Sequence, residues 1–252
     1  MSEAVKSSFI GVFDSGAGGI SVLRALVAEL PHEHFRYFGD SAHAPYGDLG
    51  EERIRELSVE HATRMINEGA KAIVIACNTA TSAAAQYLRE MFPELPIIGI
   101  EPALKPAALA GGRILVLATE ATVHLEKYHV LAATYGADDM TTVACSGLVE
   151  LIEAGNLDDP AIEAYLQEKI GHLRGQVDSV VLGCTHYPFL KRQISEVLGD
   201  VAFFDGAEGT ARNLRRRLVE HDLLAPEEEI GTVSLASSIP GQVELYQRLL
   251  NA

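Results

Sequence analysis

Two cysteines of this chain each follow a short apolar run in nearly the same local sequence. The first segment reads Ala-Ile-Val-Ile-Ala-Cys-Asn-Thr over residues 72–79, and the second reads Ser-Val-Val-Leu-Gly-Cys-Thr-His over residues 179–186. Continuous β-branched and apolar runs of this length are typical of buried strands in parallel sheets. We therefore predict that Cys77 and Cys184 lie at the carboxyl ends of two matching strands, the edge where open α/β sheets bind ligands.

A pair of thiols in such positions suits acid/base chemistry. A free thiol has a pKa of about 8.5, and a helix N-terminus close to the sulfur lowers that pKa. We predict that a helix begins directly after Cys77 and directly after Cys184, so that each thiol acts as an acid or a base near neutral pH. The third cysteine, Cys145, lacks this setting and is predicted to be a packing residue.

A metal site or a redox relay is the rival use of Cys77, Cys184 and His186. Structural zinc sites and dithiol redox centres typically contain Cys-x-x-Cys, which this chain lacks, so we predict no metal. His186 is instead expected to stabilise a Cys184 thiolate or to supply a second proton. Glu153 is a candidate for orienting this histidine, the alternative being a solvated position on a helix face.

Residues 14–19 form a glycine-rich turn, Asp-Ser-Gly-Ala-Gly-Gly, after the first predicted strand. The turn departs from Gly-x-Gly-x-x-Gly, and an aspartate at its start repels phosphate, so dinucleotide binding is not favoured. Its backbone N–H groups can still hold a carboxylate. Asp14 is expected to accept from a ligand ammonium group or to tune a cysteine; the alternative is an ordinary turn or helix-cap role.

Three further short segments supply possible ligand contacts. In the Pro-Tyr-Gly segment at residues 45–47, the Tyr46 side chain and the Gly47 N–H are predicted to close over a substrate carboxylate, unless this loop only caps the domain. Asn78 and Thr79 after the first thiol, and Thr185 after the second, are short polar donors. Each can equally be a plain helix cap.

Composition narrows the functional classes. The 252 residues carry a formal net charge of −15, which argues against nucleic acid and anionic membranes because both attract Lys and Arg. The N-terminal residues lack the apolar core of a signal peptide, and no apolar run approaches membrane-spanning length. Three cysteines without a disulfide-rich pattern predict a reducing compartment, and hence a cytoplasmic protein.

Strand-like and helix-like segments alternate along the chain, which predicts an α/β fold with mainly parallel sheets. The duplicated cysteine segments favour two similar domains, residues 1–101 with 209–252 and residues 102–208, with hinges near residues 101 and 208 and the active site in the cleft between them. Strands are predicted at 9–13, 35–39, 72–77, 97–100, 114–118, 141–145, 179–183, 201–204 and 232–236. Helices are predicted at 20–30, 51–67, 81–91, 122–135, 148–154, 160–174, 189–198, 210–220 and 243–250.

Four motifs together resemble a known family. They are Phe-Asp-Ser-Gly-Ala-Gly-Gly at 13–19, Pro-Tyr-Gly at 45–47, Ala-Cys-Asn-Thr-Ala at 76–80 and Gly-Cys-Thr-His-Tyr-Pro at 183–188. In this order and spacing the chain resembles the glutamate racemase family over residues 9–211. The resemblance implies a cofactor-independent enzyme that interconverts L- and D-glutamate and supplies D-glutamate for peptidoglycan, and a homodimer is expected.

The resemblance also implies roles for individual residues. Cys77 and Cys184 are similar to the two catalytic acid/base groups, with Asp14 and His186 as their assistants. The implied substrate contacts comprise both assistants together with Ser15, Tyr46, Gly47, Asn78, Thr79 and Thr185. Glu153 falls in a more loosely matching segment, near the histidine of the family. Two segments depart from the family pattern, Asp-Leu-Gly at 48–50 and Phe-Asp-Gly-Ala-Glu at 204–208, and the second leaves the hinge position open.

The implied chemistry is consistent with the residues. Racemisation removes a proton from one face of a carbon and returns one to the other, and two opposed thiols meet that need. A pyridoxal enzyme would need a Schiff-base lysine, and none occurs in the four motifs. Two alternatives stay open: an aspartate or hydantoin racemase with a similar cysteine pair, and a small-molecule-binding or regulatory protein on a two-domain scaffold.

Overall fold

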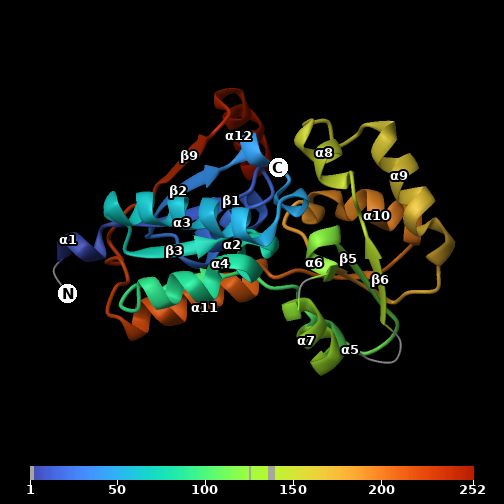
Figure 1. Cartoon of the computed structure of the whole chain (residues 1–252), viewed down its shortest axis with the longest axis horizontal. Helices are drawn as coiled ribbons and strands as arrows, with labels where there is room; N and C mark the ends of the chain where they lie inside the picture. The colour runs from blue at the N-terminus through green and yellow to red at the C-terminus, as the bar shows by residue number, and fades with distance from the viewer. Residues whose placement is uncertain (1–2, 125, 136–139) are drawn as a thin grey trace. The chain divides into compact units, whose positions relative to one another are not determined.

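The structure is a computed structural model that describes residues 3–124, 126–135 and 140–252. The chain forms two compact units (Figure 1), the first from Met1–Ile100 and Ala207–Ala252 and the second from Glu101–Gly206. Each unit contains one parallel β-sheet with helices packed against it. The predicted fold class, two similar α/β units with parallel sheets, is therefore confirmed.

The first sheet has five strands in the order β4-β3-β1-β2-β9, and every neighbouring pair is parallel. Its last strand comes from the C-terminal segment, which returns to the first unit and pairs with β2. The strands are β1 (Phe9–Asp14), β2 (His34–Gly39), β3 (Ala72–Ile75), β4 (Ile97–Gly99) and β9 (Val233–Ser237).

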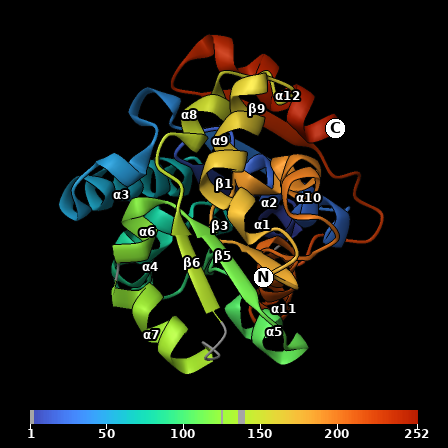
Figure 2. The same cartoon turned by 90° about the vertical axis from the view of Figure 1, so that its right-hand side faces the viewer.

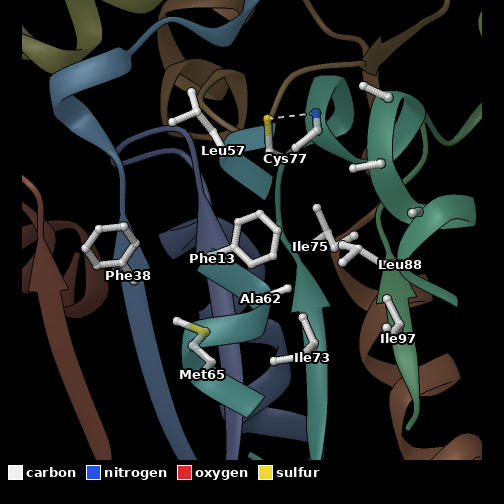
Figure 3. Packing of buried hydrophobic residues seen from close by; sticks show 14 of the residues in the cluster. Phe13, Phe38, Leu57, Ala62, Met65, Ile73, Ile75, Cys77, Leu88 and Ile97 are labelled. Atoms are coloured by element: carbon white, nitrogen blue, oxygen red, sulfur yellow. Dashed lines mark hydrogen bonds between the residues drawn. The ribbon is translucent and has the colours of Figure 1, made fainter. Parts of the chain in front are cut away.

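Alternating side chains of this sheet pack on two helical layers. Phe13, Ile73 and Ile75 belong to one core cluster with residues of α3 and α4 (Figure 3). On the opposite face, Tyr37 makes an edge contact with Tyr246 of α12. Helix α12 packs against α2, and α2 packs against α11. The helices are α1 (Glu3–Lys6), α2 (Ile20–Glu29), α3 (Glu51–Asn67), α4 (Asn78–Met91), α11 (Ala207–Glu220) and α12 (Val243–Asn251). Short 3₁₀ helices are η1 (Ser41–His43), η2 (Tyr46–Asp48) and η5 (Pro240–Gln242).

The second sheet has four parallel strands in the order β6-β5-β7-β8. Matching β5, β6, β7 and β8 to β1, β2, β3 and β4 gives the same strand order as in the first sheet, so the two units repeat one topology. The strands are β5 (Ile114–Ala118), β6 (Met140–Ala144), β7 (Ser179–Leu182) and β8 (Ala202–Phe204).

Helices cover both faces of the second sheet (Figure 2). Leu115, Leu117 and Val180 pack in one cluster with residues of α8, α9 and α10, whereas Val116 and Val181 pack in another with residues of α5 and α7. The helices are α5 (Leu104–Ala110), α6 (Glu120–His124), α7 (Glu126–Tyr135), α8 (Leu148–Glu153), α9 (Pro160–Ile170) and α10 (Lys191–Leu198). Short 3₁₀ helices are η3 (Gly171–Leu173) and η4 (Tyr187–Leu190).

The segment after Cys184 differs from the prediction. A turn and η4 follow the thiol, and α10 begins only at Lys191, so the predicted helix directly after Cys184 is wrong. Pro188 gives the physical reason, because a residue before proline is disfavoured in the α conformation and Pro188 lacks an N–H donor. Helix α5 was not predicted, and the helix predicted over 122–135 is described as α6 and α7, with residue 125 outside the described residues.

Candidate active site

Cys77 lies two residues beyond the end of β3 and is the N-cap residue of α4 (Figure 3). Its side chain is buried, with 5% of its surface exposed, and its Sγ accepts a hydrogen bond of 3.4 Å from the Ala80 N–H. The partial positive charge at the N-terminus of a 14-residue helix favours negative charge on that sulfur. This thiol therefore has the helix-cap setting expected from the sequence.

The neighbouring strand brings Asp14 and Ser15 to the same edge of the sheet. The Ser15 hydroxyl accepts from the Cys77 thiol, with 3.7 Å between oxygen and sulfur. Asp14 is fully buried, and its Oδ2 accepts from the N–H of Gly19 at 2.8 Å and of Gly16 at 3.3 Å. A Cβ on Gly19 would lie 2.6 Å from the Asp14 Cβ, so the turn requires glycine at that position. Asp14 thus fixes the glycine-rich turn beside the thiol.

Tyr46 is buried in the same core cluster as Cys77. Its hydroxyl donates to Asp40 Oδ2 at 2.8 Å, so in this structure the phenol proton is directed at a carboxylate of the protein. Burial, the charge of Asp40 and the hydrogen bond to it, together with the nearby Cys77 and Asp14, raise the pKa of Tyr46 well above its usual range. Gly47 follows within η2, which packs against α4.

Asn78 and Thr79 form the first turn of α4, directly after the thiol, and both are buried. The Asn78 Oδ1 atom is buried and has no hydrogen-bond partner among the described residues. A buried amide oxygen without a partner is costly, which makes it a natural acceptor for a ligand N–H group. Thr81 has a structural role, because its hydroxyl bonds to both Ile75 O and the Ile100 N–H.

Cys184 occupies the matching place in the second unit, two residues beyond the end of β7. It is buried, with 8% of its surface exposed, and its Sγ lies 3.7 Å from His186 Nδ1. Thr185, also buried, stands between them in the turn. The second thiol therefore contacts an imidazole where the first contacts a helix N-terminus.

Glu153, the last residue of α8, contacts the other side of that imidazole. Its Oε1 lies 2.7 Å from His186 Nε2, and both side chains are largely buried. Burial alone would lower the pKa of His186, but hydrogen bonding to Cys184 and Glu153 outweighs burial and holds this pKa well above its ordinary value. A protonated His186 can then donate to the sulfur through Nδ1 and to the carboxylate through Nε2.

Cys145 lies one residue beyond β6 and is buried in the same cluster as Cys184. Burial raises the pKa of Cys145 to about 12, so this thiol is neutral near pH 7. None of the three cysteines forms a disulfide.

Two negative findings apply to the described part of the chain. Residues 3–124, 126–135 and 140–252 contain no group of three or more His, Cys, Asp or Glu side chains placed to hold a metal ion. Across the same residues, no helix has both the length and the apolar character that crossing a membrane requires.

A buried cluster around Asp40 escaped the sequence analysis. Asp40 accepts hydrogen bonds from Tyr46, His61 and His43, all within 3.0 Å. His61 reads in the sequence as one polar residue of an amphipathic helix, and Asp40 as the start of a loop. The available signal was position, because Asp40 directly follows a strand, as Asp14 ends one.

The comparisons with known proteins agree with this architecture. Residues 10–214 match the family model described as Asp/Glu/Hydantoin racemase. A glutamate racemase of Clostridium perfringens is 45% identical over 257 aligned positions, covering 99% of each chain.

Solved structures give the same result. A glutamate racemase of Thermus thermophilus, in complex with beta-chloro-D-alanine, has a TM-score of 0.81 and 38% identity, covering 98% of this chain and 93% of its own. A glutamate racemase of Francisella tularensis, in complex with D-glutamate, has a TM-score of 0.83 and 28% identity, covering 98% and 95%. The chain therefore belongs to the Asp/Glu/Hydantoin racemase family and is similar over nearly its full length to the glutamate racemases within it.

Proposed function

We propose that this chain interconverts L- and D-glutamate without a cofactor, with Cys77 and Cys184 as the two acid/base groups. The observation that carries the proposal is the placement of the thiols. Each thiol is buried two residues beyond the end of a strand, β3 in the first unit and the equivalent β7 in the second. Both strands end at the edge where α/β sheets bind ligands. A binding protein has no need of two matched acids, whereas racemisation needs one on each face of the α-carbon.

In the proposed reaction each unit contributes one thiol, and the segments near residues 101 and 208 connect the two units. One thiol is ionised and the other protonated when L-glutamate binds, and the states are exchanged when D-glutamate binds. The protonation states then belong to the pair, as does the pH profile. His186 would stabilise the Cys184 thiolate, and the N-terminus of α4 the Cys77 thiolate.

The difficult species in this reaction is the carbanion at the α-carbon. Its charge spreads onto the α-carboxylate, so preorganised N–H and hydroxyl donors in a dry site must stabilise it. The first turn of α4, with Thr79, and Thr185 in the second unit supply such groups, and the Ser15 hydroxyl and the Gly47 N–H add to them. Asn78 Oδ1, buried without a partner among the described residues, suits the α-ammonium group.

The wider role follows from the family. We propose that the enzyme supplies D-glutamate for peptidoglycan and works in the cytoplasm, where three buried cysteines without disulfides remain reduced. We also propose a homodimer, the commonest symmetric assembly.

A chiral assay tests the proposal. Purified protein is offered L-glutamate or L-aspartate with a chelator present and without pyridoxal phosphate, and the Cys77→Ala/Cys184→Ala double variant controls for contaminating racemases. D-Glutamate should form with the wild type alone. Formation of D-aspartate in its place would reassign the substrate, and no turnover of either would contradict the proposed racemase.

A further inference from the structure

The carboxylate of Asp40 is almost completely buried and holds three donors. Tyr46 Oη lies 2.8 Å from Oδ2, His61 Nε2 lies 2.9 Å from Oδ2, and His43 Nδ1 lies 2.9 Å from Oδ2 and 3.0 Å from Oδ1. Burial by itself would raise the pKa of Asp40, but these hydrogen bonds hold that pKa well below its usual range. Asp40 is therefore an acceptor only, and all three partners donate to it.

Asp40 stands beside the Cys77 half of the proposed site. It lies one residue beyond β2, and its N–H donates to Asp14 O at 2.9 Å, so it extends the edge formed by Asp14, Ser15 and Cys77. The strand order β3-β1-β2 places the carboxyl ends of these three strands next to one another.

The second unit shows that the fold does not demand a charge here. Cys145 occupies the position of Asp40, one residue beyond β6, and its N–H donates to Ala118 O at 2.9 Å as that of Asp40 donates to Asp14 O. A buried neutral thiol fills that position. The cluster around Asp40 is therefore a feature of the first unit. Burying a carboxylate is costly unless it is fully paired, and the three hydrogen bonds to Asp40 supply that pairing.

The connection from Asp40 to the thiol passes through Tyr46. The phenol is 1% exposed, shares a core cluster with Cys77, and belongs to η2, which packs against α4. The hydrogen bond to Asp40 fixes the orientation of the Tyr46 hydroxyl.

His61 fixes the opposite side of the carboxylate. It belongs to α3, its ring contacts those of Phe13 and Phe38 at centroid distances of 6.0 and 4.8 Å, and its Nδ1 has no partner among the described residues. His61 Nε2 donates to Asp40 Oδ2, so the contacts of this ring with Phe13 and Phe38 also help to fix the carboxylate. Packing against Phe13 and Phe38 therefore positions His61. Hydrogen bonds then connect His61 to Asp40 and Asp40 to Tyr46.

We propose that Asp40 is a positioning residue for proton transfer at Cys77 and acts through Tyr46. This inference rests on the proposed two-thiol racemase. Displacement of the phenol would change the packing around Cys77 and leave Cys184 and His186 unchanged. The expected damage is therefore one-sided, confined to the proton-transfer step that uses Cys77.

A one-sided change has a distinctive kinetic signature. L- and D-glutamate have equal free energies, so kcat/KM stays equal in the two directions in any variant. The primary isotope effects on kcat/KM, measured with α-deuterated L- and D-glutamate, can still differ from each other. A higher barrier at Cys77 raises the effect for the enantiomer that Cys77 deprotonates, and lowers it for the other, since Cys184 then removes the deuteron before a slower step.

The experiment measures these isotope effects for both enantiomers in Asp40→Asn, Tyr46→Phe and the double variant, with Cys77→Ser and Glu153→Gln as references for the two sides. Asp40→Asn should lower kcat/KM about ten- to a hundredfold, the range expected for misplaced reacting groups. For each enantiomer, its isotope effect should change in the same direction as in Cys77→Ser and in the opposite direction to that in Glu153→Gln. In the Tyr46→Phe background, Asp40→Asn should add no further asymmetry.

Glu33→Gln is the matched control. Glu33 is another buried carboxylate of the first unit, paired with Lys71 Nζ at 2.6 Å, but both residues lie just before strands, at the amino edge of the sheet. This variant should lower thermal stability and leave the isotope effects unchanged.

Each outcome decides the proposal. Isotope effects in Asp40→Asn that resemble those in Glu33→Gln, with lower stability and no asymmetry, would overturn it. Tyr46→Phe, which removes a single oxygen, carries the same test if Asp40→Asn does not fold. If Cys77→Ser fails to change the isotope effects of the two enantiomers in opposite senses, the two-thiol mechanism itself fails, and the positioning role fails with it.

Discussion

The two units repeat one strand order but surround their thiols differently. Cys77 caps a 14-residue helix and bonds to a serine hydroxyl, with the carboxylates of Asp14 and Asp40 along the same edge. Cys184 precedes a turn and a short 3₁₀ helix, and a buried His186–Glu153 pair contacts it. The sheet determines where each sulfur lies, and the loops determine which groups surround it. The proposed reaction acts on the two faces of one carbon and tolerates this difference, provided that both thiols can lose and regain a proton.

The largest effects should come from the thiols themselves. Cys77→Ser and Cys184→Ser should each lower kcat/KM by roughly 10³-fold, the middle of the range that one positioned acid/base group contributes, because a serine hydroxyl is a far weaker acid than a thiol. Chiral chromatography of glutamate after fixed times measures the loss. Retention of more than about a tenth of wild-type activity in either variant, with kcat/KM compared at equal folded fraction, would show that the two units do not share the chemistry.

An intermediate effect is expected at Glu153, the group that only the second unit supplies. Glu153→Gln removes the charge that helps to hold the pKa of His186 high, so that pKa should fall. His186 is protonated below its pKa, so its help to Cys184 is lost as pH rises through that value. The alkaline limb of kcat/KM against pH should therefore move to lower pH, with about a tenfold loss near neutrality.

Glu120→Gln is the control for that profile, because Glu120 pairs with His124 in the same unit at 2.9 Å, but with both side chains exposed. It should leave the pH profile in place. An alkaline limb that does not move in Glu153→Gln, or that moves to higher pH, would contradict the proposed role of protonated His186 in stabilising the Cys184 thiolate.

The smallest effect is expected at Cys145, which occupies in the second unit the position that Asp40 occupies in the first. Its neutral thiol packs in the core, so Cys145→Ala should cost about 1 kcal/mol of unfolding free energy, the central value for point substitutions. Activity should stay within about twofold of the wild type, which corresponds to a change in activation free energy of less than about half a kcal/mol. Urea unfolding and the chiral assay measure the two quantities. A large loss of activity in a folded Cys145→Ala variant would mean that this edge position has a chemical role in both units.

The same contrast explains how far the sequence could predict the structure. The apolar runs before Cys77 and Cys184 predicted both strands, and strand ends in a parallel sheet share an edge, so the grouping of Asp14, Ser15 and Cys77 was predictable. The turn and 3₁₀ helix directly after Cys184 were not, because proline at position 188 disfavours an α-helix that starts at the thiol.

The groups from distant segments were the hardest to predict. His61 and Asp40 are 21 residues apart and meet because α3 packs against β1 and the His61 ring contacts Phe38 of β2. Sequence spacing contains no signal for such a contact. Glu153 and His186, 33 residues apart, were paired in the prediction by the resemblance as much as by their chemistry. Positions at strand ends are thus predictable from pattern, whereas partners supplied by helices depend on tertiary packing.

The most direct test of the two-thiol account follows the label at the α-carbon. Wild-type protein is given L-glutamate in D₂O, and at low conversion the deuterium content of recovered L-glutamate and of product D-glutamate is measured; the reverse direction is run in the same way. A two-thiol mechanism predicts deuterium in the product and protium in the recovered substrate in both directions, because one thiol keeps the abstracted proton while the other delivers a solvent deuteron. Deuterium entering recovered substrate as fast as product forms, or protium carried into product, would show a single base serving both faces and would contradict the account.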